Sequence, residues 1–120
     1  MKRPSEYHKE GYTCAEAILK SYNEEFGTDI PVSLGSGMGT GVTVGSLCGA
    51  VNGAVLAIGF IKGRESNEEK NEARTYSREL MNKVREKYSS EICLDLKKNK
   101  ISCAEIIDFS YDALKELLNS

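Results

Sequence analysis

The sequence predicts an all-α protein, a compact bundle of four main helices with a glycine-rich loop before the second. Apolar residues recur at three- and four-residue steps in four segments, as they do on the buried face of a helix. Two of these segments begin with a capping-box pattern, and no segment shows the alternation typical of a half-buried strand. A chain of 120 residues is expected to form a single domain, residues 1–120, whose core needs no disulfides.

The first helix is predicted from Ser5 to about Phe26, because one apolar stripe continues through this segment and Gly27 is suited to end it. Cys14 lies on that stripe. A loop containing Pro31 follows. Residues 34–45 contain five glycines, which predicts turns and a short helical piece near residues 36–38.

The second helix is predicted from near Ser46 to Lys62, with Gly63 as its stop, and it is rich in small residues. One row at four-residue spacing contains Gly45, Gly49, Gly53, Ala57 and Ile61. Each glycine inside a helix costs about 0.5–1 kcal/mol relative to alanine. The row therefore predicts close approach of another backbone or of a cofactor, and a central helix packed tightly inside the chain is the simplest interpretation. An interface in a homo-oligomer is the alternative.

The third helix is predicted to start at the capping box of residues 66–69 and to end near residues 89–90. A short segment with Cys93 and a lysine-rich turn follow. A second capping box, Ser102 to Glu105, opens the last helix, which is expected to reach about Leu118.

Four cysteines are the main candidates for chemistry: Cys14, Cys48, Cys93 and Cys103. They are far apart in the sequence and include no C-x-x-C pair, which argues against a zinc ribbon and a thioredoxin-type site. Cys48 is expected about two residues inside a helix, and Cys103 at the first helical position. Free N–H groups there favour a thiolate by about 0.3–1 kcal/mol, or up to ~2 kcal/mol when partly buried. Any of these cysteines, Cys14 above all, could instead be a small buried hydrophobe.

Composition excludes several classes of protein. The net charge of −2 includes no basic excess that would indicate binding to nucleic acid or to an anionic membrane. The most apolar segment, residues 47–61, is shorter than the ~20 residues that span a bilayer. The protein is therefore expected to be soluble and cytoplasmic, where four cysteines favour metal or redox chemistry over permanent disulfides.

Other groups add little at this stage. His8 is the only histidine and is expected to face solvent. The glycine-rich loop lacks the Lys-Ser/Thr ending of a phosphate-binding loop and follows no strand. We expect it to cover the cysteine site and to bring backbone amides to sulfur.

The segment Cys48-Gly49-Ala50-Val51-Asn52-Gly53 resembles the central motif of the C_GCAxxG_C_C family of small redox-active proteins. Cys14, within Tyr12 to Ala17, resembles the family's first cysteine, and Cys93 and Cys103 match its closing pair. The resemblance implies redox activity or metal binding through the four cysteines, with Gly49 and Gly53 as spacers for backbone approach. A similar domain of split-Soret cytochromes c is associated with an iron–sulfur site, although this chain lacks haem motifs.

The first hypothesis is therefore an electron-transfer or redox protein that holds an iron–sulfur cluster on Cys14, Cys48, Cys93 and Cys103 and serves an unidentified redox partner. We expect Gly45, Gly49 and Gly53 to support the cofactor. A second hypothesis is a metal-free thiol–disulfide protein or redox sensor. A third is a structural zinc site or an interaction module. The sequence names no substrate, so enzymatic turnover stays open.

Overall fold

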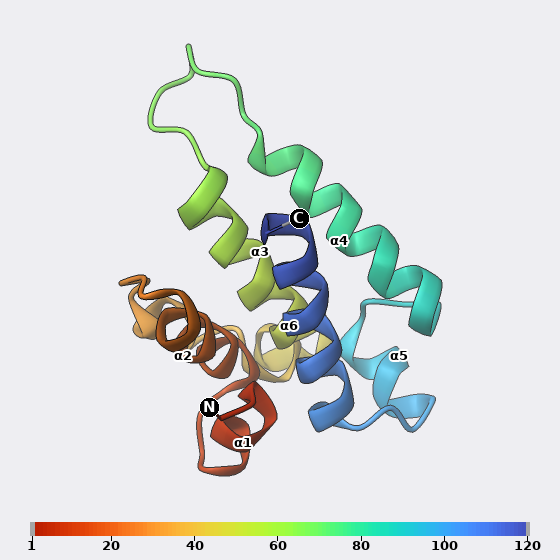
Figure 1. The fold of residues 1–120 in the computed structure, drawn as a ribbon. Coiled ribbons are helices and arrows are strands. Elements are labelled where there is room, and N and C mark those ends of the chain that lie inside the picture. The colour runs from red at the N-terminus through yellow and green to blue at the C-terminus, as the bar shows by residue number, and fades with distance from the viewer. Residues whose placement is uncertain (1, 120) are drawn as a thin grey trace.

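The computed structural model describes residues 2–119, which are mostly helical and contain no β-strand (Figure 1). The elements in chain order are α1 (Pro4–Lys9), α2 (Cys14–Phe26), η1 (Val32–Gly35), η2 (Gly41–Gly45), α3 (Gly49–Lys62), α4 (Ala73–Tyr88), α5 (Cys93–Lys98) and α6 (Cys103–Asn119). The predicted all-α class is confirmed, and α2, α3, α4 and α6 are the four long helices. Within these described residues, no helix has both the length and the apolar character needed to cross a membrane.

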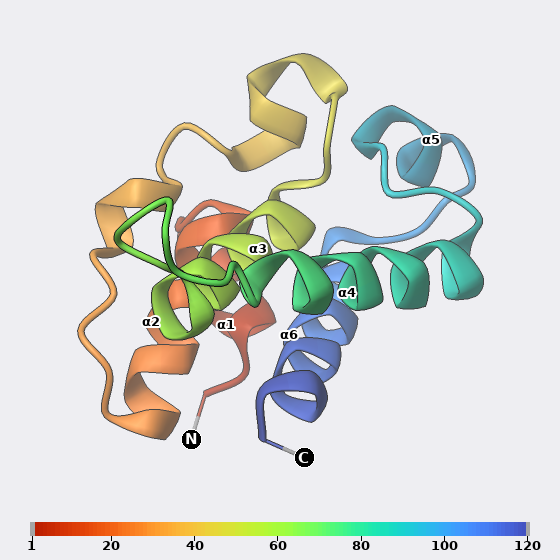
Figure 2. The same cartoon turned by 90° about the horizontal axis from the view of Figure 1, so that it is seen from above.

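Helix α3 is the centre of the bundle, since it packs against α2, α4 and α6 (Figures 1 and 2). Its small residues allow this. Ala50, Ala54 and Ala57 are fully buried, and the core continues through Ile18 of α2 and Ile107 of α6. Helix α1 packs against both α2 and α6 (Figures 1 and 2).

The prediction of one continuous first helix from Ser5 to Phe26 is wrong, because the chain turns between α1 and α2. Gly11 takes a φ of 117°, which a helix does not allow. Thr13 then caps α2, with its Oγ1 accepting the N–H of Glu16 at 3.1 Å and the Glu16 carboxylate accepting the N–H of Thr13 at 2.8 Å. Cys14 is consequently the first residue of a helix and not the middle of one. Gly27 ends α2 in the left-handed conformation, as predicted.

The second helix ends at Lys62 as predicted, but it begins at Gly49 rather than near Ser46. Residues 46–48, which precede the helix, are extended and lie beside residues 91–93. The N–H of Cys48 donates to the carbonyl of Glu91 at 2.9 Å, and the N–H of Cys93 donates to the carbonyl of Ser46 at 2.7 Å. These backbone groups are used between segments and are therefore not available to a helix. The glycine-rich loop turns as expected, although its helical pieces are the end of η1 and all of η2 rather than residues 36–38.

The third helix starts at Ala73, so its predicted start at residues 66–69 is wrong. The capping contacts exist: Ser66 Oγ accepts the N–H of Glu68, and the Glu69 carboxylate accepts the N–H of Ser66, both at 3.1 Å. They close only an isolated turn, because residues 63–70 are all exposed and no packing offsets the entropy of ordering them. The last helix follows its prediction, with Ser102 Oγ accepting the N–H of Glu105 at 3.1 Å.

The glycines of α3 mark a close backbone contact with α2. A Cβ at Gly53 would lie 2.8 Å from the Cα of Ala15 and 3.0 Å from its carbonyl oxygen. A Cβ at Gly49 would lie 2.7 Å from the carbonyl oxygen of Met38. The predicted approach of another backbone is confirmed at both positions, and both contacts are made within the chain.

We expect Gly53→Ala to destabilise the fold. Its Cβ must displace the backbone of α2, and overpacking of this kind costs about 1–3 kcal/mol, which exceeds the 0.5–1 kcal/mol gained in helix propensity. Gly59→Ala is the matched control in the same helix, because a Cβ there meets nothing within 4 Å. Urea unfolding followed by circular dichroism should show a lower free energy of unfolding for the first variant and an unchanged or higher one for the second. Equal values for the two variants would contradict the contact.

Candidate metal centre

All four cysteines line one cavity of about 170 Å³ at the end of the bundle. Cys14, Cys48 and Cys93 are buried, with 5–8% of each residue exposed, whereas Cys103 is exposed. The rest of the lining is partly apolar and includes Leu96, Ile101 and Ile106. The expectation that the fold brings these distant cysteines to a common pocket is confirmed.

Each cysteine stands at the start of a helix. Cys14, Cys93 and Cys103 are the first residues of α2, α5 and α6, and Cys48 is the N-cap of α3. The first N–H groups of a helix have no partner within it, and its N-terminus carries a partial positive charge. Four helix starts therefore face one cavity and favour negative charge inside it. The sequence predicted a helix start for Cys48 and Cys103 only. Cys103 is at its predicted position, whereas Cys48 is the N-cap and not inside the helix, because α3 begins at Gly49. The position of Cys14 was missed because the turn before α2 was not predicted.

Backbone hydrogen bonds hold Cys48 beside Cys93. The two bonds described above, from Cys48 to Glu91 and from Cys93 to Ser46, surround an isolated antiparallel bridge between Leu47 and Ile92. Because the bridge residues immediately precede Cys48 and Cys93, the bridge brings the starts of α3 and α5 together.

Glycines make room for the cysteine side chains. A Cβ at Gly49 would lie 3.2 Å from the Cβ of Cys14. Gly41, with a φ of 61°, lies so close to Cys93 that a Cβ there would be 2.7 Å from the Cβ of Cys93. Gly41 is a site residue that the sequence analysis did not single out. Gly39 and Thr40 line the cavity beside it, so the glycine-rich loop does cover the cysteines.

The three glycines expected to support a cofactor differ in position. Gly49 lines the cavity. Gly53 packs on Ala15, the residue after Cys14, and Gly45 packs on Leu94, the residue after Cys93. Both therefore fix the segments that carry cysteines.

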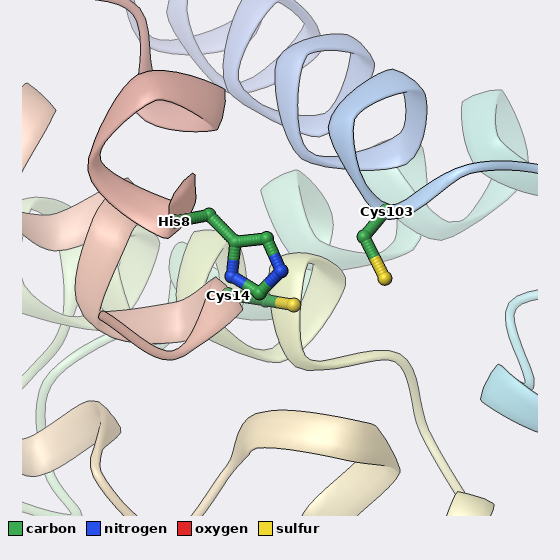
Figure 3. A group of neighbouring side chains, drawn as sticks. All are labelled: His8, Cys14 and Cys103. Atoms are coloured by element: carbon green, nitrogen blue, oxygen red, sulfur yellow. The ribbon is translucent and has the colours of Figure 1, made fainter. Parts of the chain in front are cut away.

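His8 is half-buried and lines the same cavity, so the expectation that it faces solvent is wrong. Its ring and the thiols of Cys14 and Cys103 point toward one another, and one donor atom from each lies within 4.8 Å of the others (Figure 3). Sequence reasoning missed this residue because it treated α1 and α2 as one helix. The Thr13-to-Glu16 capping box was the available signal, since it starts a new helix at Cys14 and so separates α2 from the segment that carries His8.

Burial disfavours the thiolate form of Cys14. Burial first, and then the neighbouring thiols Cys103, Cys48 and Cys93, together raise the pKa of Cys14 from 9.0 to about 12. This rise corresponds to roughly 4 kcal/mol, more than the ~2 kcal/mol that a helix N-terminus supplies in a partly buried site.

Burial likewise raises the pKa of Cys48. The backbone N–H groups of Val51 and Ala50, in the first turn of α3, oppose that rise. The thiolate expected at Cys48 from its helix position is thus disfavoured by burial in the metal-free protein.

A family model described as "Putative redox-active protein (C_GCAxxG_C_C)" matches residues 12–117. The chain belongs to this family. No curated protein and no solved structure gives a significant match. The family match includes all four cysteines of this C_GCAxxG_C_C protein and the Cys48-to-Gly53 motif, but it begins after His8 and α1.

In the reduced, metal-free protein we expect Cys14 to be the slower of two thiols to alkylate, and Cys103, which is exposed, the faster. A pKa of about 12 in place of 9.0 lowers the thiolate fraction near neutral pH about 1,000-fold, and burial slows access further. The rate at Cys14 should rise about tenfold per pH unit until its pKa is reached. Mass spectrometry of iodoacetamide-treated protein measures both sites, with urea-unfolded protein as the control. Similar rates at Cys14 and Cys103 in the folded protein would overturn this description of the cavity.

Proposed function

We propose that this protein is a redox-active electron-transfer protein that binds an iron–sulfur cluster through Cys14, Cys48, Cys93 and Cys103. One observation carries the proposal: four thiols from the starts of four helices line a single cavity. The family description agrees with redox activity.

The residues present fit such a cluster. Four cysteine thiolates are the usual ligand set of two-iron and four-iron clusters. The cavity of about 170 Å³ is far larger than the ~10–15 Å³ that one water requires, so it has room for more than a single ion. A cluster on thiolates is anionic, and Lys97 lines the cavity as a cation.

The cluster would supply one-electron transfer when bound, and the protein would tune it. The N-terminal amides of α2, α3 and α6 favour the more negative, reduced state and therefore raise the potential. Leu96, Ile101 and Ile106 limit the entry of water. The exposed position of Cys103 gives a redox partner its nearest approach to the site.

The alternatives are less well supported. A thiol–disulfide protein needs an attacking thiolate, and the raised pKa values of Cys14 and Cys48 disfavour a thiolate at these two residues at neutral pH. A purely structural zinc site accounts for four thiols, but it gives no reason for a cavity of this size.

Protein prepared without oxygen should contain iron and acid-labile sulfide, and Cys14→Ser, Cys48→Ser or Cys93→Ser should each lower both severalfold, because each removes one ligand. Gly59→Ala, outside the cavity, is the control for handling and expression. Elemental analysis and a sulfide assay provide the measurement. A wild-type protein that takes up iron and sulfide no better than the cysteine variants do would show that the proposed function is wrong.

A further inference from the structure

The cavity contains a second donor set that four thiolates do not account for. His8 comes from α1, Cys14 from α2 and Cys103 from α6, and their donor atoms lie within 4.8 Å of one another (Figure 3). In a tetrahedral zinc site, ligand bonds of about 2.0–2.3 Å place the donor atoms about 3.6–3.8 Å apart. Small side-chain rotations therefore bring the three atoms to binding distance. His8 lies outside the range that the family model matches.

The imidazole of His8 is oriented as metal-binding histidines are. Its Nδ1 lies 2.9 Å from the carbonyl oxygen of Tyr12. A carbonyl oxygen can only accept, so Nδ1 carries the hydrogen and the lone pair of the neutral ring is on Nε2. A backbone carbonyl that fixes the ring through its other nitrogen is a common feature of histidine ligands.

Helix α1 is also fixed to the helix that carries Cys103. Arg3 donates two hydrogen bonds of 2.9 Å to the carboxylate of Asp112, and the hydroxyl of Ser5 donates to Asp108 at 2.8 Å. Both acidic residues belong to α6, whose first residue is Cys103. A bidentate arginine–carboxylate pair restrains geometry as well as adding energy. The position of His8 relative to Cys103 is therefore determined by contacts outside the cavity.

We propose that His8 Nε2, Cys14 Sγ and Cys103 Sγ form a site for one divalent transition-metal ion of borderline softness, such as Zn²⁺, without Cys48 and Cys93. Imidazole and thiolate are the donors that Zn²⁺ prefers. Binding releases the two thiol protons to solvent, and the dication with two thiolates is neutral overall. At least one position of the ion stays open toward the cavity. Because this site shares Cys14 and Cys103 with the proposed cluster, the two metals exclude each other.

The test uses Co²⁺, a spectroscopic substitute for Zn²⁺, with the full chain in which Cys48→Ser and Cys93→Ser are combined. This variant is stripped of metal and kept reduced. We expect it to bind one Co²⁺, with thiolate-to-cobalt absorption and paramagnetically shifted ring protons of His8. Adding His8→Asn should weaken binding at least about 10-fold, because it removes a ligand. Asparagine can still donate to the Tyr12 carbonyl, so the turn between α1 and α2 is preserved.

An unchanged Co²⁺ affinity after His8→Asn would overturn the proposal, as would a folded double-serine variant that binds no Co²⁺. If the double-serine variant does not fold, the wild-type chain with ¹⁵N-labelled histidine and Zn²⁺ decides the question. A changed Nε2 signal on addition of zinc supports the site, and an unchanged signal refutes it. The four-thiolate cluster cannot form in the double-serine variant, while iron and sulfide in wild-type protein test the proposed function separately. Either proposal can therefore fail alone.

Discussion

The close backbone contact between α2 and α3 is the constraint on which the rest of the structure depends. Two of the three glycines of α3 lie at this contact, where the missing Cβ lets Gly53 pack on Ala15 and Gly49 lie beside Cys14. The start of α2 is thereby placed at the start of α3, so Cys14 and Cys48 line the same cavity. Glycine inside a helix costs stability, and here that cost is offset by an approach that any side chain would prevent. The remaining thiols are brought in by the short bridge beside Cys93 and by the packing of α6 on α3.

The cavity combines two opposing electrostatic effects. Helix starts favour negative charge, whereas burial penalises it, and for Cys14 burial is the larger effect. A buried thiol of this kind is a poor nucleophile, because it is rarely deprotonated. It can still bind a metal, because the cation replaces the proton and its positive charge stabilises the buried thiolate. This balance is our reason for preferring metal-based electron transfer to disulfide exchange. The same cavity is lined by His8 and by all four cysteines, so both proposed donor sets share one site.

The sequence was most informative where local chemistry and packing agree. Gly27 ends α2 and Ser102 caps α6, as predicted. In both cases the helix next to the capping residue has a buried apolar face. The capping box at Ser66 gave a wrong helix start. Its hydrogen bonds form, but no apolar helix face follows until Ala73. The opposite error occurred at Gly11, where an uninterrupted apolar stripe concealed a turn. The convergence of the cysteines was predicted from their number and from the family resemblance. The position of His8 was not, because it depends on contacts between α1 and α6 that are about a hundred residues apart in the sequence.

X-ray absorption at the iron edge of protein prepared without oxygen tests the central claim most directly, because it reports the atoms around the metal. The account predicts a first shell dominated by sulfur, together with iron–iron scattering from a cluster held by Cys14, Cys48, Cys93 and Cys103. A first shell of oxygen and nitrogen without iron–iron scattering would contradict it, since iron would then be bound somewhere other than the cavity formed by the four helix starts.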